Sequence, residues 1–383
     1  MRHHYFDHNA TSPLTAPVRE AYLAALDEAY GNASSIHRLG QIAKQKLEGA
    51  RRVIAQSLGA NAKEIVFVSG GTEADNLALR GVAGPGDHIV VTSIEHPAVL
   101  ATAAALERAG TSVTLVPVLH TGIVDPAAIG RALRAETRLV SVIHASNELG
   151  TVQPLAEIGK ITRAAGVLLH ADGVQAFGKI PVSVTELGVD LYTVSGHKLG
   201  APKRIGALYV RKGTPLNATS WGGHHEGDRR PGTENVAGAV AFAAAVEMAD
   251  WSEVGALRDL LEQQILARIS HATVNGQGTR LPNTTNIRFD GIEGEALLIS
   301  LDLRGFAVSS GAACSSGSVE PSHVLTAIGL APRDARSSLR FSLGPQNTAA
   351  EVEALVQAVE ESVAHLRRIS TEPHLQNRVL AHA

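Results

Sequence analysis

Cysteine is almost absent from this sequence of 383 residues, in which Cys314 is the one residue of its kind. A single thiol cannot form a disulfide within the chain, and it cannot supply the set of thiolates that a structural zinc ion or an iron–sulfur cluster needs. The neighbours of Cys314 at positions 309–318 are all serine, glycine or alanine. Because such small residues pack little, they favour a mobile loop with a functional thiol over the alternative, a cysteine that fills the core.

Long apolar runs and a strong charge imbalance are also lacking. The sequence has no stretch of about 18 apolar residues of the kind that spans a membrane. Hydrophobic residues make up 44%, charged residues 19%, and the formal net charge is −3. These values argue against a disordered chain, direct nucleic acid binding and membrane association. Residues 1–7 show no apolar stretch of a signal peptide, so we expect a cytoplasmic protein.

Aromatic residues make up only 4% of the sequence, whereas glycine occurs 37 times. The core must therefore be mostly aliphatic, and the glycines suit many tight turns between strands and helices. Short apolar runs indicate strands at 65–68, 88–91, 112–116, 138–143, 167–170 and 190–194. Helical patterns lie between them at 73–82, 98–108, 126–134 and 155–165. This alternation predicts an α/β fold with a mostly parallel central sheet.

The pattern changes after a long helical stretch at about 234–269. Strands are expected at 283–289, 306–309 and 338–342, with helices at 294–303 and 323–328. The last helix begins with a capping box formed by Thr348 and Glu351. We therefore expect a large domain at 13–255 and a smaller α+β domain, made of 1–12 and 256–383, that carries the cysteine loop at 309–320.

Two charged residues follow neighbouring predicted strands, Asp172 after one and Lys198 after the next. In an open parallel sheet, ligands collect beyond the carboxyl ends of the strands. Such a pair suits pyridoxal phosphate, with the lysine as its covalent anchor and the aspartate keeping the pyridine nitrogen protonated. An ordinary acid and base at two strand ends is the alternative.

A glycine-rich turn at 69–72 connects the strand at 65–68 to the next helix. Glycines there let the backbone approach a phosphate at the helix N-terminus, although a plain turn fits the same residues. The turn matches neither a P-loop nor a dinucleotide fingerprint. His96 has a flat ring that could stack on a cofactor. The histidine pairs at 3–4 and 224–225 lack the spacing of a metal site, so we expect no metal.

Taken together, the motifs resemble the NifS/IscS-type cysteine desulfurases, members of the class V aminotransferase group of fold-type-I pyridoxal-phosphate enzymes. The resemblance covers nearly the whole chain, with the motifs in the same order. They occupy residues 5–11, 34–40, 69–76, 95–100, 147–150, 170–175, 195–198, 229–235, 309–322 and 338–344. Two places depart from the common pattern: 226–228 reads Glu-Gly-Asp where relatives often have Glu-Arg-Gly, and His8 stands where Asn is common.

The resemblance implies a role for each matching residue. Lys198 would hold the cofactor covalently, Asp172 would pair with its pyridine nitrogen, His96 would stack on the ring, and Gln175 would bond the phenolic oxygen. The phosphate would be bound by Gly71, Thr72, Ser195 and His197, with Thr233 reaching in from the second subunit of a homodimer. The substrate carboxylate would be bound by Asn147 and Arg340, and the sulfur-accepting nucleophile would be Cys314.

The reaction that the resemblance implies converts L-cysteine to L-alanine and leaves the sulfur as a persulfide on Cys314. The sulfur would then pass to an acceptor protein, such as an iron–sulfur scaffold, or into other products such as thiolated tRNA. Two enzymatic alternatives use the same scaffold, namely a selenocysteine lyase and an aminotransferase. A scaffold or binding protein without turnover is a third alternative, against which the intact Lys198, Asp172 and Cys314 argue.

Overall fold

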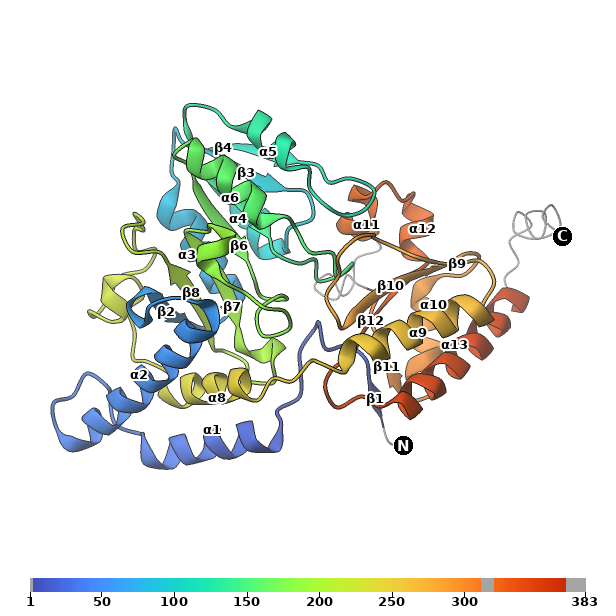
Figure 1. Ribbon diagram of the computed structural model, residues 1–383, viewed down its shortest axis with the longest axis horizontal. Coiled ribbons are helices and arrows are strands. Elements are labelled where there is room, and N and C mark those ends of the chain that lie inside the picture. The colour runs from blue at the N-terminus through green and yellow to red at the C-terminus, as the bar shows by residue number, and fades with distance from the viewer. Residues whose placement is uncertain (1–2, 311–319, 370–383) are drawn as a thin grey trace.

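The computed structural model describes residues 3–310 and 320–369. Figure 1 shows a large sheet with helices on both faces beside a smaller group of strands and helices. In the described part of the chain, no helix combines the length and the apolar character needed to cross a membrane. The large sheet with its helices confirms the predicted α/β architecture, and the smaller group is the expected α+β part. The exact division at residue 255 stays a prediction.

The large sheet has seven strands, and most neighbouring pairs run parallel. From one edge to the other the strands are β2 (Ile65–Val68), β8 (Gly206–Val210), β7 (Leu191–Ser195), β6 (Leu168–Asp172), β5 (Thr137–Ile143), β3 (His88–Thr92) and β4 (Ser112–Val116). Only β8 runs against its neighbours, since it pairs antiparallel with both β2 and β7. The six strands predicted from apolar runs are all found, with ends that differ by at most two residues, whereas β8 was not predicted.

This sheet is buried on both faces, which explains why its strands read as continuous apolar runs. Val90 of β3 belongs to one core cluster, while its neighbours Ile89 and Val91 belong to another on the opposite face. The covering helices are α1 (Ala16–Glu28), α2 (Arg38–Leu58), α3 (Gly71–Val82), α4 (Pro97–Arg108), α5 (Pro126–Ala132), α6 (Leu155–Ala164), α7 (Val184–Leu187) and α8 (Val236–Glu247). Of these, α1, α2 and α7 were not predicted.

The smaller part is built on a three-stranded antiparallel sheet and a two-stranded parallel one. Its elements are β1 (His4–Tyr5), α9 (Val254–Arg268), β9 (Ala272–Val274), β10 (Thr284–Phe289), α10 (Gly294–Asp302), β11 (Phe306–Ala307), α11 (His323–Ala327), α12 (Pro332–Arg336), β12 (Ser338–Ser342) and α13 (Ala349–Ile369). β1 pairs with β11, so the start of the chain joins this part. The predicted capping box of α13 is confirmed, because the backbone N–H of Thr348 donates to Glu351 and that of Glu351 donates to the Thr348 hydroxyl.

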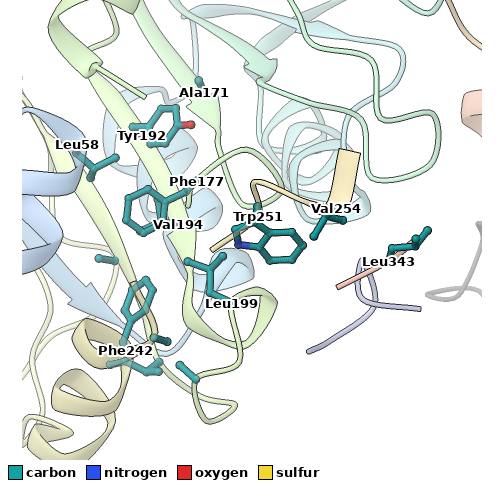
Figure 2. Close-up of a cluster of buried hydrophobic side chains, with 14 of the residues drawn as sticks. Leu58, Ala171, Phe177, Tyr192, Val194, Leu199, Phe242, Trp251, Val254 and Leu343 are labelled. Carbon is teal, nitrogen blue, oxygen red and sulfur yellow. The ribbon is translucent and has the colours of Figure 1, made fainter. Parts of the chain in front are cut away.

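The long helical stretch expected at 234–269 is divided in the structure. α8 ends at Glu247 and α9 begins at Val254, with the buried Trp251 between them. Figure 2 shows this tryptophan near Val254, with Phe242 of α8 farther away, below Phe177 in the view. The rings of Phe177 and Phe242 meet edge to face, with centroids 6.1 Å apart. These few aromatic side chains therefore join α8 to the turn that follows β6.

Replacing Phe242 tests this packing. Phe242 is fully buried, so Phe242→Ala should leave a cavity and lower the free energy of unfolding by about 3–5 kcal/mol. Leu303→Ala is the control, because Leu303 is 74% exposed and its truncation should cost no more than about 0.5 kcal/mol. Urea unfolding followed by circular dichroism measures both. Equal midpoints for the two variants would contradict the assigned packing.

Candidate active site

The candidate site lies at the carboxyl ends of β6 and β7. Asp172 is the last residue of β6 and pairs in register with Thr193 of β7. Lys198 ends the short 3-10 helix η2 (Gly196–Lys198), which follows β7 directly. The two strands thus bring Asp172 and Lys198 to the same edge of the sheet, where parallel sheets bind their ligands.

A cavity of about 370 Å³ opens beside them at the N-terminus of α3. Its lining includes Ala10, Thr11, Ser69, Gly70, Gly71, Thr72, Glu73, Ser195, His197, Lys203 and Arg204. Gly70 has a φ of 153°, which side-chain-bearing residues rarely adopt, and a Cβ on Gly71 would lie 2.9 Å from Val174. The free N–H groups and the positive end of the α3 dipole favour an anion in this cavity.

The four predicted phosphate-binding residues of one chain, Gly71, Thr72, Ser195 and His197, all line this cavity. The Ser195 hydroxyl is buried and has no hydrogen-bond partner among the described residues, which leaves it available to a ligand. His197 Nδ1 is 3.2 Å from the Thr11 hydroxyl. Burial lowers the pKa of His197 to about 4, with Lys198 and Lys203 adding to the effect, so its ring is neutral at pH 7.

Thr233 behaves differently, because it is exposed and is not among the residues that line this cavity. The segment before it is fixed to the fold by Glu226, whose side chain is 2% exposed. Both carboxylate oxygens of Glu226 accept from Arg51, at 2.6 and 2.8 Å, and one also accepts from the Phe67 N–H at 2.8 Å. The unusual sequence at 226–228 therefore retains an anchoring carboxylate, although all three residues have positive φ.

An acidic cluster with one imidazole lies next to the cavity. One ligand atom each of Asp75, His96 and Asp172 lie within 4.8 Å of one another. Asp172 is buried and accepts from the Val174 N–H at 3.0 Å. Burial raises the pKa of Asp172, an effect that nearby His96 and Lys198 oppose. A cationic group facing Asp172 would therefore be strongly favoured.

His96 caps the N-terminus of α4, where its Nδ1 accepts from the Ala98 N–H at 3.1 Å. Burial lowers the pKa of His96, while Asp172 raises it. The helix cap fixes the ring of His96, one nitrogen of which lies within 4.8 Å of a carboxylate oxygen of Asp172. The predicted His96, Asp172 and Lys198 are thus brought together in one place.

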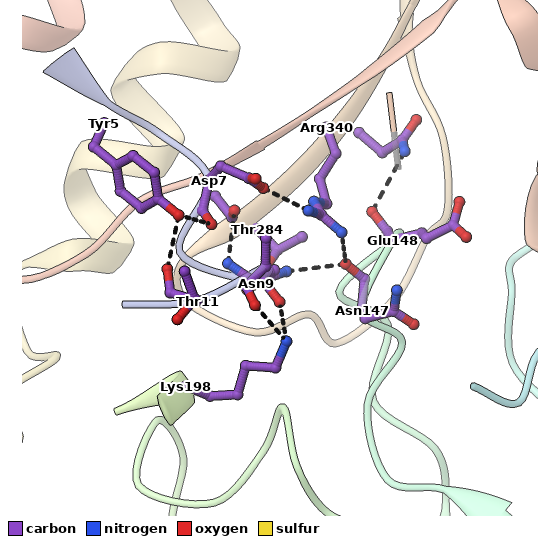
Figure 3. Close-up of polar contacts among 12 residues, drawn as sticks. Tyr5, Asp7, Asn9, Thr11, Asn147, Glu148, Lys198, Thr284 and Arg340 are labelled. Carbon is purple, nitrogen blue, oxygen red and sulfur yellow. Dashed lines mark hydrogen bonds and ion pairs between the residues drawn. The ribbon is translucent and has the colours of Figure 1, made fainter. Parts of the chain in front are cut away.

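Lys198 is held by the N-terminal segment. Its Nζ donates to the backbone carbonyls of Asn9 at 2.6 Å and Ala10 at 2.9 Å. Gln175 Nε2 donates to the same carbonyl of Asn9 at 3.0 Å. Figure 3 shows the lysine pointing at this segment from below, with Asn9 between it and the strands of the smaller sheet. The sequence did not indicate a role for Asn9, because a backbone carbonyl leaves no signal in the sequence.

The predicted carboxylate-binding pair, Asn147 and Arg340, is also brought together. Arg340 lies on β12 and is 2% exposed. Its Nη1 donates to the Asn147 carbonyl at 3.0 Å, and its Nη2 pairs with Asp7 at 2.5 Å, as Figure 3 shows. Its Nε has no partner among the described residues. The guanidinium is thus oriented by Asp7, and its Nε–H remains available as a donor to a ligand.

Cys314 lies outside the described residues, but both ends of its segment are anchored at this site. Ser309 exchanges two backbone hydrogen bonds with Arg340, of 3.2 and 2.7 Å. Beyond the loop, the Ser322 hydroxyl donates to Glu148 at 2.6 Å, and His323 Nε2 lies 3.0 Å from the Glu95 carbonyl. The segment that carries the thiol therefore leaves from Arg340 and returns beside Asn147.

Several buried ionisable residues of this site were not predicted, among them Asp75, Glu95, Glu148 and Lys179. Burial raises the pKa of Glu95 to about 8, although the Thr92 hydroxyl and the Ile143 N–H donate to its carboxyl group. Asp75, Glu95 and Glu148 stand within predicted motifs, which is the one signal that could have indicated them. Lys179 looks like an ordinary surface residue in the sequence.

Comparisons with known proteins agree with this arrangement. The family model described as aminotransferase class-V matches residues 4–355. A cysteine desulfurase IscS of Dictyoglomus turgidum is 44% identical over 377 residues, which cover 96% of each chain. A solved NifS-like protein superposes with a TM-score of 0.89 at 36% identity, covering 96% of this chain and 100% of that one. The structure described as SspA in complex with cysteine superposes with a TM-score of 0.82 at 34% identity, covering 90% of this chain and 99% of that one.

These similarities confirm the predicted fold type I and the resemblance that the motifs carry. They extend over nearly the whole length of both partners in each comparison, so they concern the complete fold rather than one motif. The chain belongs to the aminotransferase class-V family, as a relative of its NifS- and IscS-type members.

Proposed function

We propose that this protein is a pyridoxal-phosphate-dependent cysteine desulfurase, which converts L-cysteine to L-alanine and retains the sulfur as a persulfide on Cys314. One observation carries the proposal: Lys198, Asp172 and His96 meet beside an anion-favouring cavity, while the cysteine segment starts and ends at Arg340 and Glu148. Relatives named cysteine desulfurase support it, as does the neighbour described as a complex with cysteine.

The residues present fit pyridoxal phosphate. The unpartnered Ser195 hydroxyl and the N-terminus of α3 would bind its phosphate, together with Gly71, Thr72 and His197. Asp172 would pair with the pyridine nitrogen, His96 would cover the ring, and Lys198 would bind the cofactor covalently. When bound, the protonated ring of this cofactor withdraws electrons from the substrate Cα and so makes its proton acidic.

The protein's own residues then carry out the remaining work. Arg340 and Asn147 orient the substrate carboxylate, and the amine of Lys198 removes the Cα proton and returns a proton to the product. The thiolate of Cys314 attacks the substrate sulfur, so that a carbon–sulfur bond breaks while a sulfur–sulfur bond forms. The balance is complete: one thiol and one cysteine give one persulfide and one alanine, without an external oxidant.

The proposal includes a homodimer, a sulfur acceptor and a cytoplasmic location. Thr233 is exposed and away from the cavity of its own chain, so we place it at the phosphate of a second subunit. With no second cysteine in the chain, the persulfide must pass to an external thiol, such as that of an iron–sulfur scaffold or a tRNA-thiolation protein. A reactive free thiol suits the reducing cytoplasm.

An aminotransferase or a selenocysteine lyase would use the same cofactor site. Alanine formed from cysteine without any keto acid excludes transamination, and comparison of cysteine with selenocysteine as substrates tests the lyase. Neither alternative accounts for a cysteine among small residues in a segment whose flanking residues, Ser309 and Ser322, bond to Arg340 and Glu148.

The first functional prediction concerns Lys198. Lys198→Ala should remove the visible absorbance of the covalently bound cofactor and abolish alanine production, because the amine that binds it and moves the proton is lost. Lys160→Ala changes an exposed lysine of α6 and should retain both properties. Substantial alanine production by Lys198→Ala would refute the role assigned to Lys198.

The second prediction concerns Arg340. Arg340→Lys should raise KM for cysteine about 10- to 100-fold and lower kcat less, because lysine retains the charge but not the planar fork. Lysine is preferable to alanine here, since it leaves the partly buried Asp7 with a cation. Steady-state kinetics measures both constants. An unchanged KM would mean that the carboxylate is bound elsewhere.

The third prediction concerns Cys314. Cys314→Ser should still bind pyridoxal phosphate, and its spectrum should still change on adding cysteine, because neither step uses the thiol. It should nevertheless form almost no alanine, whereas Ser315→Ala should remain active. Mass spectrometry of the wild-type protein after cysteine should find the added sulfur on the peptide that contains Cys314. Near wild-type sulfide release by Cys314→Ser would overturn the desulfurase proposal.

A further inference from the structure

Lys179 is a buried lysine behind the candidate cofactor site. Only 5% of it is exposed, and its Nζ donates to Gln175 Oε1 at 2.8 Å and to Asn9 Oδ1 at 3.0 Å. Neither partner is a carboxylate, although burying a lysine is costly without a counter-charge. The Trp251 ring offers a weak substitute, since its centre lies 5.3 Å from Nζ. Lys179 is therefore held by two side-chain amide oxygens.

These contacts decide which way each amide points. The oxygen of Gln175 accepts from Lys179, so its Nε2 must face the opposite side, where it donates to the Asn9 carbonyl at 3.0 Å. That carbonyl also accepts from Lys198. The donor end of Gln175 therefore faces the lysine that would carry the cofactor.

Asn9 is oriented in the same way. Its Oδ1 accepts from Lys179 and from Asn283 Nδ2, both at 3.0 Å. Its Nδ2 is thereby directed to the Thr284 hydroxyl at 2.9 Å and to the Asn147 carbonyl at 3.0 Å. If Lys179 were absent, rotation of either amide by about 180° would no longer cost a hydrogen bond to it.

Both charge states of Lys179 can supply the two hydrogen bonds that orient the amides. Burial lowers the pKa of Lys179, and the charges of Lys198 and Arg340 lower it further. A neutral amine still has two hydrogens, which match the two amide oxygens, and an ammonium has three. In both states Lys179 has enough hydrogens to donate to Gln175 Oε1 and to Asn9 Oδ1.

We propose that Lys179 is a positioning residue, which holds the oxygen of Gln175 so that Nε2 of the same amide donates to the phenolic oxygen of bound pyridoxal phosphate. The inference rests on the proposed function, because it assumes that this cofactor binds at Lys198. A fixed donor stabilises the ionised phenolic oxygen. Losing it makes that oxygen more basic, so the bound cofactor should retain its proton to a higher pH.

The test is a pH titration of the visible absorbance of the cofactor-loaded protein. Lys179→Met fills a similar volume without a donor and should shift the midpoint upward by about one pH unit, a tenfold change in proton affinity. Lys179→Leu carries the same prediction should the methionine variant not fold. Lys160→Met removes an exposed lysine and is the matched control, with an unchanged midpoint. An unshifted midpoint in folded, cofactor-loaded Lys179→Met would overturn the inference.

A double-mutant cycle separates positioning from a direct effect of charge. If Lys179 acts through Gln175, Gln175→Leu should shift the midpoint upward by itself, and adding Lys179→Met should shift it no further. A second, independent shift in the double variant would overturn the inference, because it would show that Lys179 acts without Gln175. A lower melting temperature with an unchanged midpoint would also overturn it, since only a structural role would remain.

The titration also distinguishes this inference from the proposed function. If the wild-type protein gains no visible absorbance with pyridoxal phosphate and forms no alanine from cysteine, the proposed function fails. If the wild-type protein does both and Lys179→Met titrates like it, only the role of Lys179 fails.

Discussion

The site depends on the backbone carbonyl of Asn9, which accepts from both Lys198 and Gln175. The side chain of the same residue bonds to Asn283 and Thr284 in the smaller part of the fold and to Lys179 in the larger. The short segment around Asn9 is thus fixed from both sides. Because it joins β1 to the larger part, the distance between the two sheets and the position of Lys198 are set together.

Several ionisable side chains of this site are buried close together, away from water. Asp75, Asp172 and Glu95 are buried near one another, and burial raises the pKa of each. Burial lowers the pKa of Lys179 in the same region. A cationic ring nitrogen would pair with the buried carboxylate of Asp172, and a phosphate would pair with the positive end of the α3 dipole. Each ligand charge would thus supply the sign that the protein lacks at that place. The site is therefore electrostatically shaped for a ligand that carries both charges.

The sequence predicted those features of the fold and site that leave a pattern of side-chain types along the chain. Strands buried on both faces read as apolar runs, and the order of the strands placed Asp172 and Lys198 at one edge of the sheet. It did not predict β8, a five-residue run that begins with Gly and Ala, or the division between α8 and α9, where helical composition continues through the break. Asn9 acts through a carbonyl that every residue possesses. Lys179 was missed because a lysine is ordinarily a surface residue, and only tertiary contacts show otherwise.

Arg340 shows how the cysteine segment and the cofactor site are joined. Its backbone pairs with Ser309, where that segment begins, and its guanidinium bonds to Asp7 and to the carbonyl of Asn147. The next residue, Glu148, accepts from Ser322, just after the segment ends. One end of the segment is therefore fixed to Arg340 and the other to the neighbour of Asn147, and Arg340 and Asn147 are the two residues that would bind the substrate carboxylate. Under the proposed function, the one thiol of this sequence would have to serve both substrate and acceptor, and attachment at these two points would keep its segment joined to the substrate site.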